Sequence, residues 1–180
     1  MSKLFLVSSV SASGKTTLVN SVIQNYNLYR IKTCTTRPKR PEEIGDEYYF
    51  LTQEEFNQRI VEESFIEHAY VYGNSYGIEK SEFENNKHKN CIVITDIQGK
   101  NNLVAIYPQI FTIFIMPPSE SVVLERLQSR NTNEKDVHTR MQHFHEEMSH
   151  ADEFHFKIPN GDLEMMTNFM NSIVSFMVHA

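Results

Sequence analysis

The feature that most constrains this chain is an apolar run, followed by a loop of small residues and then by a segment that favours a helix. The run is residues 4–7, and the loop ends in Gly14-Lys15-Thr16-Thr17. A strand that leads through such a loop into a helix N-terminus gathers backbone N–H groups around an anion. The sequence therefore predicts a phosphate-binding loop in an α/β fold.

The residue types of this loop indicate a nucleoside triphosphate. Lys15 can reach the β- and γ-phosphates of ATP, and the Thr16 hydroxyl can ligate Mg²⁺. The other loop positions bind through their backbone, which gives an expected ATP-binding set of Ser11, Ala12, Ser13, Gly14, Lys15, Thr16 and Thr17. Ser9 stands where the strict pattern has glycine, and a positive φ there or at Ala12 would cost about 1–2 kcal/mol. An ordinary polar turn is the alternative, and the loop alone does not separate kinases from other NTPases.

The rest of the chain alternates strands and helices. Further apolar runs predict strands at 91–95 and 111–116, and the patterns predict helices at 16–24, 119–130, 134–150 and 162–177. Continuous apolar runs separated by helices are typical of a central parallel sheet that is covered on both faces. With 180 residues, 40% of them hydrophobic, we expect a single domain over residues 1–180.

Residues 35–89 differ from the rest, because they are rich in charge, tyrosine and glycine. They include a capping box, Thr52 with Glu55, that predicts a helix start. We interpret 35–89 as an insertion into a core formed by 1–34 and 90–180. The polar segment 129–138 is expected to be a short lid.

Composition excludes several classes of function. A net charge of −6 argues against general nucleic-acid binding. Cys34 and Cys91 lie too far apart in sequence to indicate a disulfide framework or a cysteine zinc site. Ser8 interrupts the N-terminal apolar run before it reaches signal-peptide length, and no stretch is long enough for a transmembrane helix. We expect a cytoplasmic protein with no membrane partner.

Four histidines gather in one predicted helical segment: His138, His143, His145 and His150. Zinc would require several of them on one face with hydrogen-bonded support. The segment is polar throughout, so a solvent-facing helix is the favoured interpretation.

Further motifs follow the loop in a fixed order. They are Thr33-Cys-Thr-Thr-Arg37-Pro-Lys-Arg40, Gly45-Asp-Glu-Tyr48-Tyr-Phe50, Phe65-Ile-Glu67, Gly73-Asn-Ser-Tyr76-Gly77, Asp96-Ile-Gln98-Gly99, the set Arg126, Arg130 and Arg140, and His150-Ala-Asp-Glu-Phe154. With these motifs the chain resembles a guanylate kinase over almost its whole length. The resemblance implies a three-layer P-loop kinase fold, Mg²⁺ as cofactor, and the reaction ATP + GMP → ADP + GDP.

The resemblance also implies an acceptor site. Arg37, Arg40, Tyr48 and Tyr76 would form an acceptor clamp for the monophosphate, whose roughly two negative charges suit two guanidinium groups. Glu67 would accept hydrogen bonds from N1–H and N2–H₂ of guanine, whereas adenine would present a lone pair at N1. Thr33 would donate to O6, and Asp96 would lie near the acceptor base and the metal.

On the donor side, Arg130 and Arg140 match the lid arginines of the family. Together with Lys15 they would neutralise charge on the transferring group, which is the main catalytic task in phosphoryl transfer. Arg126 would bind ATP, and Asn160 would lie near its adenine.

Some positions depart from the family pattern. Ile78 and Ile94 stand where a hydroxyl and an acidic residue are common, and His68 replaces a frequent aromatic residue. Losing a donor to a buried acceptor costs about 1–3 kcal/mol. Two alternatives therefore stay open: a kinase of the same fold for another phosphorylated acceptor, and a catalytically silent module that binds phosphorylated peptides. The expected partners are ATP with GMP or dGMP, and the chain is expected to be a monomer or homodimer.

Overall fold

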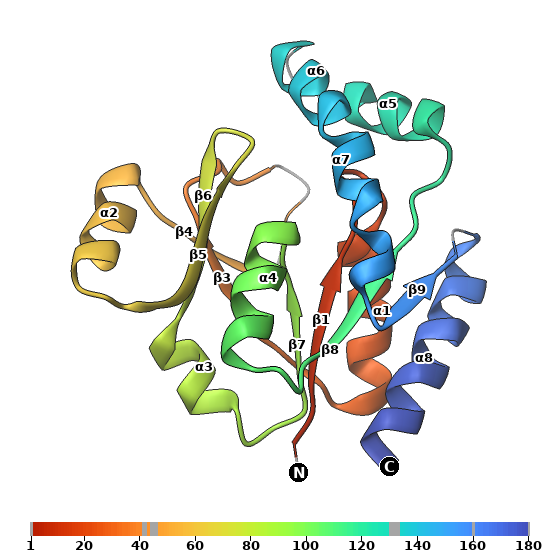
Figure 1. Ribbon diagram of the computed structural model, residues 1–180, viewed down its shortest axis with the longest axis horizontal. Helices are drawn as coiled ribbons and strands as arrows, with labels where there is room; N and C mark the ends of the chain where they lie inside the picture. The colour runs from red at the N-terminus through yellow and green to blue at the C-terminus, as the bar shows by residue number, and fades with distance from the viewer. Residues whose placement is uncertain (1, 41–42, 44–46, 130–133, 160, 180) are drawn as a thin grey trace.

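The computed structural model of the chain describes residues 2–40, 43, 47–129, 134–159 and 161–179 (Figure 1). Its strands are β1 (Leu4–Ser8), β2 (Tyr29–Arg30), β3 (Thr33–Thr35), β4 (Tyr48–Phe50), β5 (Phe65–Val71), β6 (Asn74–Glu79), β7 (Cys91–Ile94), β8 (Phe111–Ile115) and β9 (Phe156–Ile158). The helices are α1 (Lys15–Tyr26), α2 (Gln53–Val61), α3 (Lys80–Asn86), α4 (Ile97–Ile106), α5 (Glu120–Ser129), α6 (Glu134–Gln142), α7 (Phe144–Ser149), the 3₁₀ helix η1 (Ala151–Glu153) and α8 (Leu163–His179).

The central sheet is parallel throughout, with the strand order β2-β7-β1-β8-β9. The three strands predicted from apolar runs are β1, β7 and β8, and they occupy the middle of this sheet. The α/β fold class with a parallel central sheet is confirmed. The edge strands β2 and β9 were not predicted, because they are short and no apolar run marks them.

Side chains of β1 alternate between the two faces of the sheet, as the two-residue period of a strand requires. Phe5 and Val7 pack with residues of α1 and α8, whereas Leu6 packs on the opposite face with residues of α4, α5 and α7. Figure 1 shows α8 lying beside α1 on one side of the sheet. These two clusters give the three-layer arrangement.

A second, smaller sheet has the strand order β4-β3-β6-β5. Its core contains Cys34, Phe56 and Phe65, and Phe56 belongs to α2. The predicted capping box is confirmed, because the Glu55 amide donates to Thr52 Oγ1 at 3.1 Å and the Thr52 amide donates to Glu55 Oε2 at 2.7 Å. Figure 1 shows this sheet to one side of the central sheet, at the end where the loop after β1 lies.

The prediction of a single helix over residues 134–150 was wrong. The structure divides it at His143 into α6 and α7, although the Glu147 amide still donates to the carbonyl of His143 at 2.9 Å. The ψ of His143 is −9°, well away from the value of an ideal helix, and this unwinds the chain locally. No proline or glycine marks the break, so the sequence pattern could not show it.

Of the described helices, none combines the length and the apolar character needed to cross a membrane.

Candidate active site

The loop between β1 and α1 has backbone angles suited to a phosphate-binding turn. Gly14 precedes α1 with a φ of +98°, which costs glycine little. Ala12 has a φ of +61°, so its Cβ carries the strain expected from the sequence. The free amides at the start of α1 and the positive end of its dipole therefore face the same space.

Lys15 bends back along this loop. Its Nζ donates to the carbonyl and the Oγ of Ser9, both at 2.9 Å, and to the carbonyl of Val10 at 3.1 Å. Ser9 Oγ in turn donates to the carbonyl of Val10 at 2.9 Å and contacts the hydroxyl of Ser13. The serine that replaces the usual glycine thus supplies one of the acceptors for the lysine.

One cavity collects most of the residues predicted to be functional. Those that line it are Ser11, Ala12, Ser13, Gly14, Lys15, Thr16, Thr17, Thr33, Arg37, Arg40, Tyr48, Glu67, Tyr76, Asp96 and Arg140. The structure adds Ser9, Val71, Tyr72, Ile94, Thr95 and Glu147 to this lining. The cavity lies where the loop, the second sheet, the end of β7 and the helices α6 and α7 meet.

The remaining predicted residues lie elsewhere. Arg126 is exposed on α5, and its Nη1 donates to the carbonyl of Ala12 at 3.2 Å, so it contacts the loop from outside the cavity. Arg140 reaches the loop from α6, and its Nη1 donates to Ser11 Oγ at 2.7 Å. Arg130 and Asn160 lie outside the described residues.

Positive charge converges on the cavity from separate segments. Arg37 is only 8% exposed, and its guanidinium forms a two-point contact with the Glu43 carboxylate, whose shorter distance is 2.5 Å. Burial opposes the charge of Arg37, but the hydrogen bond and the charge of Glu43 more than offset this and raise its pKa. Burial, followed by the charges of Arg37 and Arg140, lowers the pKa of Arg40. All three arginines line the same cavity.

Glu67 is the unusual acid of this site. It is 6% exposed, and its Oε2 has no hydrogen-bond partner among the described atoms. Burial, assisted by the charge of Asp96, raises its pKa to about 7, although a hydrogen bond from Asn102 opposes the shift. A buried carboxylate with an unused oxygen can accept a pair of donors from a ligand.

Gly99 makes room for this carboxylate. A Cβ at position 99 would lie 3.3 and 3.4 Å from the two oxygens of Glu67 and 3.0 Å from Thr95 Cβ. Close packing against Glu67 therefore explains the glycine of the Asp-Ile-Gln-Gly motif. The sequence pattern did not reveal this contact.

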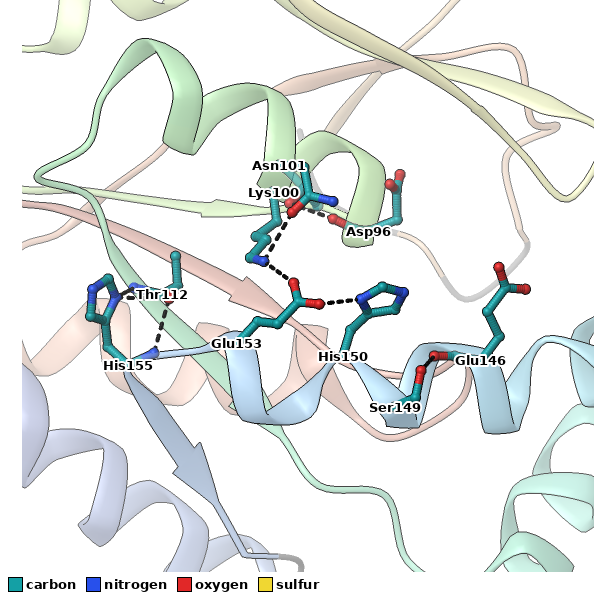
Figure 2. Close-up of polar contacts among 10 residues, drawn as sticks. Asp96, Lys100, Asn101, Thr112, Glu146, Ser149, His150, Glu153 and His155 are labelled. Atoms are coloured by element: carbon teal, nitrogen blue, oxygen red, sulfur yellow. Dashed lines mark hydrogen bonds and ion pairs between the residues drawn. The ribbon is translucent and has the colours of Figure 1, made fainter.

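Asp96 is the N-cap residue of α4, and its Oδ1 accepts the amide of Gly99 at 2.9 Å. Figure 2 shows how this helix is anchored: the buried Lys100 donates to Glu153 Oε2 at 2.6 Å, and Glu153 Oε1 lies 2.6 Å from His150 Nδ1. The helix that presents Asp96 is thus tied to the chain that follows α7.

The four clustered histidines do not converge. His143 pairs with Glu146 at 2.8 Å, and His145 lies 3.6 Å from Glu120. Across the part of the chain that the structure describes, no group of three or more His, Cys, Asp or Glu residues could hold a metal ion.

Two of the departures from the family pattern have a structural explanation. Ile78 is 1% exposed in the hydrophobic core, and Ile94 is 9% exposed at the cavity wall, where it packs with the α1–α8 face of the sheet. His68 is exposed on β5, and its carbonyl accepts from Asn102 Nδ2 at 3.4 Å.

An anion-binding loop with its lysine lines the same cavity as a pair of arginines and a buried carboxylate. This fold and this site define a P-loop phosphotransferase for a small phosphorylated acceptor.

Comparison with known proteins narrows the class. The sequence model of the guanylate kinase family matches residues 1–176. The guanylate kinase of Hydrogenovibrio crunogenus is 35% identical over 175 residues, covering 94% of this chain and 85% of the relative. The guanylate kinase of Thermotoga maritima is 36% identical over 177 residues, covering 96% and 86%. The crystal structure of guanylate kinase from Anaplasma phagocytophilum superposes with a TM-score of 0.80 at 28% identity, covering 98% of this chain and 86% of that one. The chain belongs to the guanylate kinase family.

Tyr72 and Glu147 were missed by the sequence analysis. Tyr72 lies in the turn between β5 and β6, and Glu147 lies in a helix that the sequence predicted as solvent-facing. No sequence pattern singles out either residue, because the contacts of Tyr72 with Glu147 and Arg140 join segments that are distant in the sequence.

A substitution tests the packing of Gly99. In an open helix, glycine to alanine stabilises by about 1 kcal/mol. Here we expect Gly99→Ala to lower the free energy of unfolding instead, by about 1–3 kcal/mol, because the methyl group overpacks the site. Urea denaturation measures the change, with Gln98→Ala on the exposed side of α4 as the control. A gain of about 1 kcal/mol for Gly99→Ala would contradict the packing described here.

Proposed function

We propose that this chain transfers the γ-phosphoryl group of ATP to GMP, giving ADP and GDP. The observation that carries the proposal is that Lys15, the arginines of the acceptor clamp and the buried Glu67 line one cavity. Membership of the guanylate kinase family supports the same reaction.

On the donor side, the backbone amides of residues 11–17 would bind the phosphates of ATP, and Lys15 would contact the β- and γ-phosphates. Arg140 donates to Ser11 of the loop, and we propose that it would neutralise charge on the transferring group. Arg130 would act with it. Arg126, at the outer side of the loop, and Asn160 would contribute to ATP binding.

On the acceptor side, the clamp of Arg37, Arg40, Tyr48 and Tyr76 would bind the monophosphate. Glu67 would read the N1–H and N2–H₂ donors of guanine, and Thr33 would donate to O6. No side chain need act as a strong base, because the attacking phosphate oxygen is already ionised. Binding both substrates in one cavity would also exclude water, which would otherwise hydrolyse ATP.

The donor set fits Mg²⁺. Thr16 and Asp96 both line the cavity, and hydroxyl and carboxylate oxygens are the ligand types that Mg²⁺ prefers alongside phosphate oxygens. We propose that these two residues would hold the ion, directly or through water. When bound, the ion would neutralise charge on the β- and γ-phosphates.

We also propose that the segment 35–89 is the acceptor-binding insertion and that 129–138 is a lid. Cys34 and Cys91 are both buried free thiols, which favours a reducing compartment such as the cytoplasm. Neither alternative, a kinase for another phosphorylated acceptor or a silent phosphopeptide-binding module, gains support from the relatives named above.

Lys15→Met tests the transfer. We expect kcat to fall by at least about 10³-fold, because the charge that stabilises the transferring group is lost. A coupled ADP-release assay measures this, and thermal unfolding checks that the fold is retained. Lys157→Met, on the exposed surface of β9, is the control. Turnover by Lys15→Met within tenfold of the wild type would exclude the proposed role.

Glu67→Gln tests the reading of the base. A glutamine presents an amide donor where guanine also has donors, so we expect kcat/KM for GMP to fall about 100-fold while the relative rate with AMP rises. An unchanged preference for GMP would contradict the role.

Glu67→Gln should lower activity but raise the free energy of unfolding at neutral and higher pH. The folded-state pKa of Glu67 is raised from 4.5 to about 7, so the wild type loses stability as the pH rises through this window, by roughly 3 kcal/mol in total. We expect Glu67→Gln to be more stable than the wild type above pH 7, with a difference that disappears below about pH 4.5. Urea denaturation at several pH values measures this, with Glu125→Gln on the exposed face of α5 as the control.

A further inference from the structure

Tyr72 occupies a backbone position that does not favour tyrosine. It is the first residue of the two-residue turn between β5 and β6, with a φ of +51°, and Gly73 follows with a φ of +78°. Two successive positive φ values describe the tight hairpin turn in which asparagine, aspartate and glycine predominate. A large side chain with a strained backbone angle suggests that the side chain itself has a function.

The side chain of Tyr72 lines the cavity and reaches α7. Its hydroxyl donates to Glu147 Oε1 of α7 at 2.5 Å, and its ring lies 4.8 Å from the guanidinium carbon of Arg140. The ring also meets His143, at the junction of α6 and α7, edge-on at 5.6 Å. We call the hydrogen-bonded pair the Tyr72–Glu147 bridge. It connects the second sheet, which bears the acceptor clamp, with the two helices that follow α5.

The charges around the bridge favour this hydrogen bond. Burial, together with Glu147, raises the pKa of Tyr72 well above its usual value, so the phenol remains a donor. Burial raises the pKa of Glu147, while the Tyr72 hydroxyl and the charge of Lys15 oppose the shift. Both partners are at least half-buried, so little water competes with this hydrogen bond.

The bridge is also connected to the phosphate-binding loop through Arg140. The guanidinium of Arg140 packs on the Tyr72 ring and donates to Ser11 Oγ at 2.7 Å. The second sheet, through Tyr72, therefore contacts the same arginine that reaches the phosphate loop. Tyr72 thus adds a contact across the cavity to the apolar packing of Ile78 against the central sheet.

We propose that Tyr72 and Glu147 are positioning residues that hold the acceptor clamp opposite the phosphate loop before the substrates bind. The inference rests on the proposed function for its kinetic readout. Without the bridge, a smaller fraction of the enzyme has the acceptor clamp and the phosphate loop aligned for both substrates. The apparent affinity for GMP then falls in proportion to that fraction. Saturating substrates contact both parts and restore the alignment, so the loss falls on KM and not on kcat.

The two parts of the side chain have separable effects. Tyr72→Phe removes the hydroxyl and keeps the ring beneath Arg140. We expect KM for GMP to rise about tenfold, with kcat within about twofold of the wild type. Tyr72→Leu also removes the ring, and we expect kcat to fall about fivefold in addition, since Arg140 loses its support. Tyr70→Phe, an exposed tyrosine of β5, is the matched control.

Steady-state kinetics of these variants, together with Glu147→Ala and the double variant Tyr72→Phe/Glu147→Ala, test the proposal. The double variant should raise KM no further than either single change, because both remove one interaction. A KM for Tyr72→Phe equal to that of Tyr70→Phe, or additive effects in the double variant, would overturn the bridge. A lower melting temperature with an unchanged KM would show a purely structural role and would overturn it as well.

Hydrogen exchange without nucleotides tests the bridge independently of turnover. We expect Tyr72→Phe to speed amide exchange at both ends of the bridge, in residues 71–74 and in α7, with no change for Tyr70→Phe. Unchanged exchange at both ends would overturn the proposal even if the wild type phosphorylates GMP. Conversely, suppose that Tyr72→Phe shows the expected faster exchange while the wild type does not phosphorylate GMP. That result would overturn the proposed function and leave the bridge supported.

Discussion

The convergence of positive charge on one cavity is the constraint on which the rest of this structure depends. Lys15, Arg37, Arg40 and Arg140 come from three different segments and line the same space. Like charges that line one cavity repel one another, and burial adds to the cost of each. The fold offsets this with carboxylates, as at Glu43, and with the aromatic rings against which the guanidinium groups pack. An anionic ligand with several phosphate groups complements the charge that remains.

The architecture supplies this arrangement in two parts. The carboxyl ends of the parallel strands place the phosphate-binding loop and Asp96 at one edge of the central sheet. The dipole of α1 adds a partial positive charge there. The second sheet brings a separate set of polar residues to face that edge. The second sheet has a small core of its own, and Ile78 of β6 also packs in the same cluster as Leu6 of the central sheet. The Tyr72–Glu147 bridge adds a polar contact between the two parts at the cavity itself.

Much of the fold could be predicted from the sequence, because its signals are local. The three central strands are continuous apolar runs, and the start of α2 is marked by Thr52 and Glu55. The break at His143 and the strands β2 and β9 could not be predicted, because tertiary packing and not composition determines them. The structure brings the predicted acceptor and loop residues into one cavity, while their individual roles stay predictions. Tyr72, Glu147 and the close packing of Gly99 depend on contacts between distant segments, which no single-sequence pattern encodes.

The most direct test of the central claim is an ADP-release assay with Mg·ATP and a panel of GMP, dGMP, AMP, UMP and CMP. We expect strong turnover that is confined to GMP and dGMP, because only guanine presents two adjacent donors to Glu67. Comparable turnover with AMP or the pyrimidine nucleotides would contradict the reading of guanine by that carboxylate. Silence across the panel, while Mg·ATP still raises the melting temperature, would contradict the claim that this cavity phosphorylates a nucleoside monophosphate.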